Sequence, residues 1–150
     1  MSTMILFMGI QASGKTSFYK KHLNDYEHIS LDVLNTRNKE RLAIEECISE
    51  NKSFVIDNTN PCKEDRKRYF DMIKNTDYKV VGYYFRSAIS ESIERNEGRT
   101  GKQYVPRCAI ASTFNKLELP LFEEGFSQLY YVHIDNDEFI IQNWSEEDEI

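Results

Sequence analysis

The chain has few cysteines and no long apolar run. Its three cysteines, Cys47, Cys62 and Cys108, are odd in number and widely spaced, so they indicate neither a disulfide framework nor a metal knuckle. No window approaches the roughly 18 apolar residues of a membrane span. The amino end lacks the charged region and small-residue cleavage site of a secretion signal. These absences predict a cytoplasmic protein with no membrane partner.

Internal repeats, low-complexity tracts and linkers are also missing. A chain of 150 residues is long enough to bury one core and too short for two ordinary domains. We therefore expect a single domain over residues 1–150, with an acidic tail from about residue 135.

Charge is unevenly distributed along the chain, whose formal net charge is −6. Residues 111–150 hold one Lys or Arg and ten Asp or Glu, whereas residues 61–110 hold eleven and seven. The middle third can therefore present a positive surface to a phosphorylated partner. A helix with solvated charges explains residues 63–74 equally well.

The most informative segment is residues 9–16, GIQASGKT, which matches the G-x-x-x-x-G-K-T phosphate-binding loop. An apolar run at residues 4–8 precedes it, and a helix-like stretch at residues 17–23 follows. In this context backbone N–H groups and the positive end of the helix favour phosphate. Lys15 is expected to bridge the β- and γ-phosphates, and the Thr16 hydroxyl to ligate Mg²⁺. An ordinary glycine-rich turn is the weaker explanation.

ATP and Mg²⁺ are thus the expected cofactors. The expected ATP-binding residues are Gly9, Ile10, Gln11, Ala12, Ser13, Gly14, Lys15, Thr16, Ser17 and Asp57.

Apolar runs alternate with helix-like stretches along the rest of the chain, which predicts a parallel sheet covered on both faces. Strands are predicted at residues 4–8, 27–31, 53–56, 78–85 and 128–134. Helices are predicted at residues 41–48, 63–74, 88–96 and 105–117, with Pro106 in the first turn of the last one. The predicted fold is an α/β P-loop NTPase fold with about five mainly parallel strands. The runs at residues 132–134 and 139–141 would make an edge hairpin.

Two carboxylates follow predicted strands, at the sheet edge where ligands bind in open α/β folds. Asp32 can accept a proton from an acceptor hydroxyl, although it can also cap the next helix. Asp57 can hold a water of the Mg²⁺ shell or organise its polar neighbours Asn58 and Thr59. The expected catalytic base is Asp32.

Two arginines stand near the loop at residues 98–102, which is the one mobile-looking segment. Arg95 and Arg99 are four residues apart and share a face if the helix extends to residue 99. On a short lid they could stabilise the charge of a transferred phosphoryl group. An exposed loop with ordinary basic residues is the alternative. Lys15, Asp32, Arg95 and Arg99 form the expected catalytic set, and Thr16 is the expected metal ligand.

Other polar residues carry no functional pattern. The three histidines, His22, His28 and His133, show no ligand spacing and are expected to be structural or on the surface. The segment DND at residues 135–137 resembles the opening of an aspartyl phosphatase motif, but thirteen residues after it are too few for such a domain.

With these residues in place, the chain resembles the 5′-hydroxyl polynucleotide kinase domain found in phage polynucleotide kinase and in the kinase/phosphatases of DNA repair. Besides the phosphate loop, the resemblance rests on SLD at 30–32, DNTNP at 57–61, the lid segment at 94–106 and EGFS at 124–127. It covers roughly residues 4–134 and implies that Asp32 is the general base and that Arg95 and Arg99 are lid arginines.

The sequence departs from the phage pattern at two positions. The phage family has an arginine one turn after the base, which helps to hold the acceptor's phosphate, whereas this chain has Asn35, with Arg37 two residues on. The phage family also has an aspartate at the position where this chain has Asn58. Asp57 therefore matches the repair enzymes instead. The first departure leaves the acceptor open.

Three functions compete. The leading interpretation is ATP-dependent phosphorylation of the 5′-hydroxyl of a polynucleotide end. The second is a P-loop kinase that acts on a small polar metabolite, which the acidic net charge favours. A non-catalytic nucleotide-binding module is the least supported, because loop, base and lid residues are all present. The sequence leaves open the oligomeric state and the choice of RNA or DNA.

Overall fold

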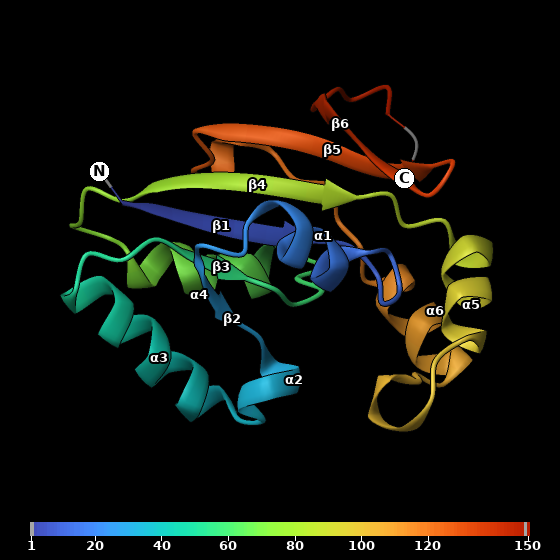
Figure 1. Ribbon diagram of the computed structural model, residues 1–150. Helices are drawn as coiled ribbons and strands as arrows, with labels where there is room; N and C mark the ends of the chain where they lie inside the picture. The colour runs from blue at the N-terminus through green and yellow to red at the C-terminus, as the bar shows by residue number, and fades with distance from the viewer. Residues whose placement is uncertain (1, 149) are drawn as a thin grey trace.

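A six-stranded sheet forms the centre of the computed structural model, which describes residues 2–148 and 150 (Figure 1). The strands are β1 Thr3–Met8, β2 Glu27–Ile29, β3 Phe54–Ile56, β4 Lys79–Phe85, β5 Gln128–Asp135 and β6 Glu138–Asn143. The helices are α1 Lys15–His22, α2 Leu31–Leu34, α3 Arg37–Ser49, α4 Lys63–Met72, α5 Ile89–Glu97 and α6 Arg107–Asn115, with 3₁₀ turns η1 Gly101–Gln103 and η2 Phe122–Glu124.

The strands lie in the order β2-β3-β1-β4-β5-β6. The first five are parallel, and β6 runs antiparallel to β5. The predicted α/β fold with a mainly parallel sheet is confirmed. The sheet has one strand more than the five expected, because the edge hairpin forms and residues 138–143 of the acidic tail join it.

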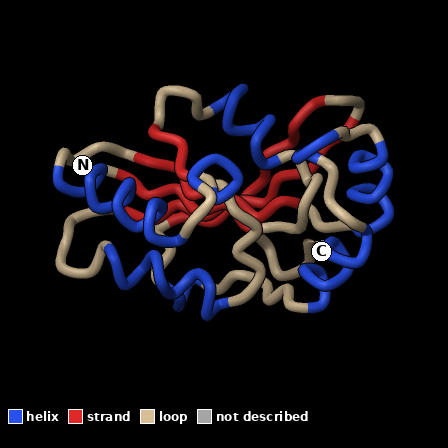
Figure 2. The backbone as a smooth tube through the Cα atoms, turned by 90° about the horizontal axis from the view of Figure 1, so that it is seen from below, coloured by secondary structure: helices blue, strands red, loops and turns tan. Residues whose placement is uncertain are grey.

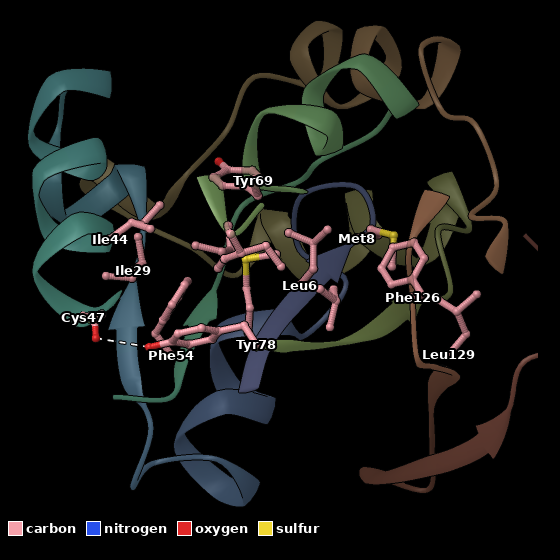
Figure 3. Close-up of a cluster of buried hydrophobic side chains, with 14 of the residues drawn as sticks. Leu6, Met8, Ile29, Ile44, Cys47, Phe54, Tyr69, Tyr78, Phe126 and Leu129 are labelled. Atoms are coloured by element: carbon pink, nitrogen blue, oxygen red, sulfur yellow. Dashed lines mark hydrogen bonds between the residues drawn. The ribbon is translucent and has the colours of Figure 1, made fainter. Parts of the chain in front are cut away.

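Side chains of β1 alternate between two apolar cores. Met4, Leu6 and Met8 face α3 and α4, in a core that also contains Ile44 and Tyr69 (Figure 3). Strand β1 has neighbours on both sides and helices on both faces, so its apolar residues are almost completely buried.

The opposite face of the sheet carries α1. Ile5 and Phe7 of β1 pack there against Phe18 and Leu23. The ring of Phe139 from β6 lies edge-on to Phe18 with centroids 5.2 Å apart, so the added strand contributes to this second core.

The carboxyl ends of β1, β2, β3 and β4 meet at one edge of the sheet, and the phosphate loop follows β1 there. Helices α5 and α6 lie beyond this edge, as both views show (Figures 1 and 2). Residues that are distant in sequence are thereby brought to one place.

Element boundaries differ from the predicted ones in three informative places. Strand β2 ends at Ile29, because the backbone N–H groups of Val33 and Leu34 both donate to Ser30 O and start α2. Helix α6 begins after Pro106, which is its N-cap and not part of its first turn. Helix α5 ends at Glu97, so Arg95 and Arg99 do not share one helix face.

Within residues 2–148 and 150, none of the helices combines the length and the apolar character required to cross a membrane.

Candidate functional site

The loop at residues 9–16 adopts backbone angles that favour glycine at two positions. Gly9 has φ 146° and Gly14 has φ 101°. A Cβ on Gly9 would lie 2.9 Å from Phe85 O, and one on Gly14 would lie 3.0 Å from the Phe139 ring. The two motif glycines therefore permit both the turn and its close packing against β4 and β6.

Lys15 lies inside this loop with only 8% of its surface exposed. Its Nζ donates to Gly9 O at 2.9 Å and to Ile10 O at 2.7 Å. The pKa of Lys15 is lowered to about 8, chiefly by burial; Asp57 and Asp32 oppose this shift, and Arg99 adds to it. Of the predicted catalytic residues, Asp32 and Arg99 thus act on the charge of Lys15, as does Asp57.

Asp57 lies directly below the loop and is almost completely buried. Its Oδ2 accepts a hydrogen bond from Thr16 Oγ1 at 2.7 Å. The same oxygen lies 2.8 Å from His28 Nε2. His28 is therefore at the site, where sequence reasoning had placed no functional histidine. A lone histidine in a short strand gives no local signal, since its partner lies 29 residues away.

Asp32 lies in α2 and is exposed. The backbone N–H of the residue before it, Leu31, is held by a network of side-chain hydrogen bonds. Leu31 N donates to Asn58 Oδ1 at 3.0 Å, and Asn58 Nδ2 donates to Glu40 Oε2 at 2.8 Å and to Tyr69 Oη at 3.1 Å. The turn before Asp32 is thus fixed by side chains from the segment after β3, from α3 and from α4.

The network is closed by Arg37, whose Nη1 donates to Glu40 Oε1 and to Tyr69 Oη, both at 2.9 Å. Burial, followed by the nearby Glu40 carboxylate, raises the pKa of Tyr69 to about 12. Tyr69 therefore keeps its hydroxyl hydrogen and donates it to Glu40 Oε2. Sequence reasoning missed Glu40 and Tyr69, because in α3 and α4 they read as ordinary helical residues.

Lid residues reach the phosphate loop from α5. Arg95 Nη1 donates to Ala12 O at 3.2 Å, and Arg95 Nη2 lies 3.5 Å from Glu91. Arg99 follows the helix and donates to Gln103 O. The structure thus brings Arg95 into contact with the loop, and it brings Arg99 within electrostatic range of Lys15.

Many cations of the middle third are paired, which reduces the positive surface expected from their number. Arg66 is completely buried and makes a two-pronged contact with Glu124. Lys67 pairs with Asp71, and Arg107 pairs with Glu97. The alternative explanation of residues 63–74, a helix with solvated charges, is wrong for Arg66. Its side chain is completely buried and pairs with Glu124, which lies before β5.

The residues beside the loop fit a magnesium ion that arrives with a triphosphate. The described part of the chain contains no cluster of three or more His, Cys, Asp or Glu that could hold a metal by itself. Mg²⁺ takes few protein ligands and keeps several waters beside phosphate oxygens. The Thr16 hydroxyl and the Asp57 carboxylate are hard oxygen donors of that kind.

No family model matches the chain. It is 28% identical over 133 residues to the bifunctional polynucleotide phosphatase/kinase of Schizosaccharomyces pombe, covering 84% of this chain and 32% of the relative. It is 39% identical over 80 residues to a putative bifunctional polynucleotide phosphatase/kinase of Acanthamoeba polyphaga mimivirus, covering 52% of this chain and 19% of the relative. The chain therefore spans about a third or less of these relatives, and its predicted resemblance to them is confirmed.

Solved structures show the same fold. Chaetomium thermophilum Kti12 in complex with ADP-AlF₃ has a TM-score of 0.71 at 18% identity, over 90% of this chain and 91% of that one. A gluconokinase from Sinorhizobium meliloti 1021 has a TM-score of 0.60 at 19% identity, over 86% and 82%. The chain thus shares the α/β fold of these proteins, as predicted from its sequence.

Proposed function

We propose that the protein transfers the γ-phosphoryl group of ATP to the 5′-hydroxyl of a polynucleotide end. The observation that carries the proposal is the phosphate loop at the carboxyl edge of the sheet, where Thr16 donates to Asp57 and Arg95 contacts the loop backbone. Phosphoryl transfer requires a held triphosphate, neutralised charge and an oriented acceptor. The polynucleotide acceptor is supported by the names of the two relatives.

Each part of the site then has one role. The loop and Lys15 bind the phosphates. When ATP binds, Lys15 Nζ donates to phosphate oxygens in place of the carbonyl oxygens of Gly9 and Ile10. Thr16 and Asp57 would hold Mg²⁺, which neutralises negative charge on the phosphates when bound. Asp32 accepts the proton of the acceptor hydroxyl.

The lid supplies the remaining positive charge. Arg95 contacts the loop backbone from α5, and Arg99 follows the same helix. Guanidinium groups there can stabilise the charge of the transferred phosphoryl group. The two arginines are therefore proposed as catalytic residues that close over the γ-phosphate.

A small polar metabolite is the second candidate acceptor. The pairing of Arg66, Lys67 and Arg107 with carboxylates favours it, because less positive surface remains for a nucleic acid. The relatives outweigh this observation, since the similarity to the Schizosaccharomyces pombe relative extends over 84% of the chain.

The deciding experiment measures transfer of labelled γ-phosphate from ATP and Mg²⁺ to 5′-hydroxyl DNA and RNA oligonucleotides, with Asp32→Ala as control. Transfer that disappears in the variant is the expected result. Retained ATP binding without transfer to any oligonucleotide would reject the polynucleotide acceptor and move the search to metabolites.

The remaining parts of the proposal concern the whole chain. Residues 1–150 act as one kinase domain, because a single sheet extends from Thr3 to Asn143. A cytoplasmic location is supported by the three cysteines, Cys47, Cys62 and Cys108, all of which are free.

A further inference from the structure

One carboxylate oxygen of the buried Asp57 contacts both Thr16, the expected metal ligand, and His28. Asp57 Oδ2 accepts from Thr16 Oγ1 at 2.7 Å and lies 2.8 Å from His28 Nε2. An ionised carboxylate has no hydrogen to give, so His28 Nε2 carries the hydrogen of this bond. Because the Thr16 hydrogen is also directed at Asp57, the lone pairs of the Thr16 hydroxyl remain for a cation.

The ring of His28 is held in place from its other side. It stacks on the ring of Tyr19 with centroids 4.2 Å apart and planes at 19°. Tyr19 Oη in turn donates to the backbone oxygen of Tyr26. The histidine therefore connects α1 to the end of β3, and its orientation is set before any ligand contacts it.

We infer that His28 is a positioning residue, which holds the Asp57 carboxylate so that Thr16 presents its oxygen to Mg²⁺. This inference rests on the proposed ATP and Mg²⁺ site. Residues that hydrogen-bond to the groups beside a metal typically change metal affinity by about 10- to 100-fold when they are lost. The His28 side chain is 21% exposed, whereas that of Asp57 is 3% exposed. A substitution can therefore be accommodated at the histidine.

Two substitutions separate the hydrogen bond from packing. His28→Gln keeps an N–H donor at the end of the side chain and loses the ring. His28→Phe keeps a ring for Tyr19 and loses the donor. The probe is ATP, and its dissociation constant is measured by calorimetry on the whole chain, once with Mg²⁺ and once with EDTA.

We expect Mg²⁺ to tighten ATP binding to the wild type, and His28→Phe to lose roughly tenfold of that gain. His28→Gln should retain most of it, and the three proteins should bind ATP equally in EDTA. If Mg²⁺ tightens ATP binding to His28→Phe as much as to the wild type, the inference is overturned. It is also overturned if both variants lose ATP affinity equally, with Mg²⁺ and with EDTA. A wild type without any Mg²⁺ effect overturns it together with the proposed metal site.

A second measurement needs no variant and so does not depend on folding of His28→Phe. Nitrogen chemical shifts of the wild-type histidines report which ring nitrogen carries the hydrogen. The Nε2–H form of His28 is expected, and an Nδ1–H form would overturn the inference. Neither measurement uses an acceptor, so failure of transfer to oligonucleotides leaves both results interpretable.

Discussion

At the scale of the residue, the protonation of Lys15 sets a pH dependence for ATP binding. Burial lowers the pKa of Lys15 to about 8, and bound phosphates would favour the charged form and raise it. Binding then takes up a proton above pH 8, so ATP affinity should fall by up to roughly tenfold per pH unit there. Calorimetric titrations between pH 6.5 and about pH 9.5 measure this slope.

Titrations at about pH 9 in two buffers with different ionisation enthalpies give the control, because they count the proton directly. Net release of a proton, or an affinity that is constant up to about pH 9.5, would contradict the role of Lys15.

Asp32 gives a second prediction at the same scale. Asp32→Asn removes the proton acceptor but preserves the size of the side chain, so ATP binding should stay within about twofold. Turnover with the true acceptor should fall by a factor of about 10² to 10⁴, which is the usual contribution of general acid–base catalysis. Steady-state kinetics and calorimetry measure the two quantities. Wild-type turnover would eliminate Asp32 as the base.

At the scale of the element, the lid is tied at its base. Asn96 is completely buried at the end of α5, and its Nδ2 donates to Val105 O. Val105 N donates back to Asn96 Oδ1 at 2.9 Å. Two hydrogen bonds between Asn96 and Val105 therefore hold together the two ends of the segment that contains the loop at residues 98–102.

Arg99 supplies the prediction for this element. Arg99→Ala should lower turnover by about a hundredfold, because a positive charge at the transferred group is lost. ATP affinity without acceptor should fall much less, since the guanidinium of Arg99 donates to Gln103 O within its own segment.

The matched control is Arg107→Ala, which removes an exposed arginine at the start of α6 that is paired with Glu97. A surface pair of this kind contributes little, so both quantities should change less than about threefold. Equal losses of turnover and ATP affinity in Arg99→Ala would indicate simple nucleotide binding.

At the scale of the whole molecule, Arg66 joins segments that are distant in sequence. Its guanidinium contacts Glu124 through Nε and Nη2, and its Nη1 donates to Asn60 O and Glu118 O. It thereby ties α4 to the turn after β3 and to the segment before β5.

Arg66→Ala should lower the free energy of unfolding by about 3–5 kcal/mol, because it leaves the Glu124 carboxylate and two carbonyls without their partner. Lys67→Ala is the control on the same helix. Its exposed pair with Asp71 contributes about 0.5 kcal/mol or less. Urea denaturation of both variants measures the difference, and similar losses would show that Arg66 is not a structural tie.

The sequence by itself determined the phosphate loop, the order of the elements and the edge of the sheet at which Asp32 and Asp57 follow their strands. These features depend on local patterns: glycines with positive φ, apolar runs of strand length, and polar residues that follow them. They also carry part of the resemblance to polynucleotide kinases, because the matched segments at 30–32 and 57–61 follow β2 and β3.

Only the tertiary structure decided which polar residues support those groups. His28 meets Asp57, Glu40 meets Asn58, and Arg66 meets Glu124 across 29, 18 and 58 residues. In the sequence, a buried arginine or histidine looks the same as a solvated one, since burial is set by the packing of other elements. The physical reason is that local patterns determine helices and strands, whereas the partner of a charge depends on how the elements are packed together.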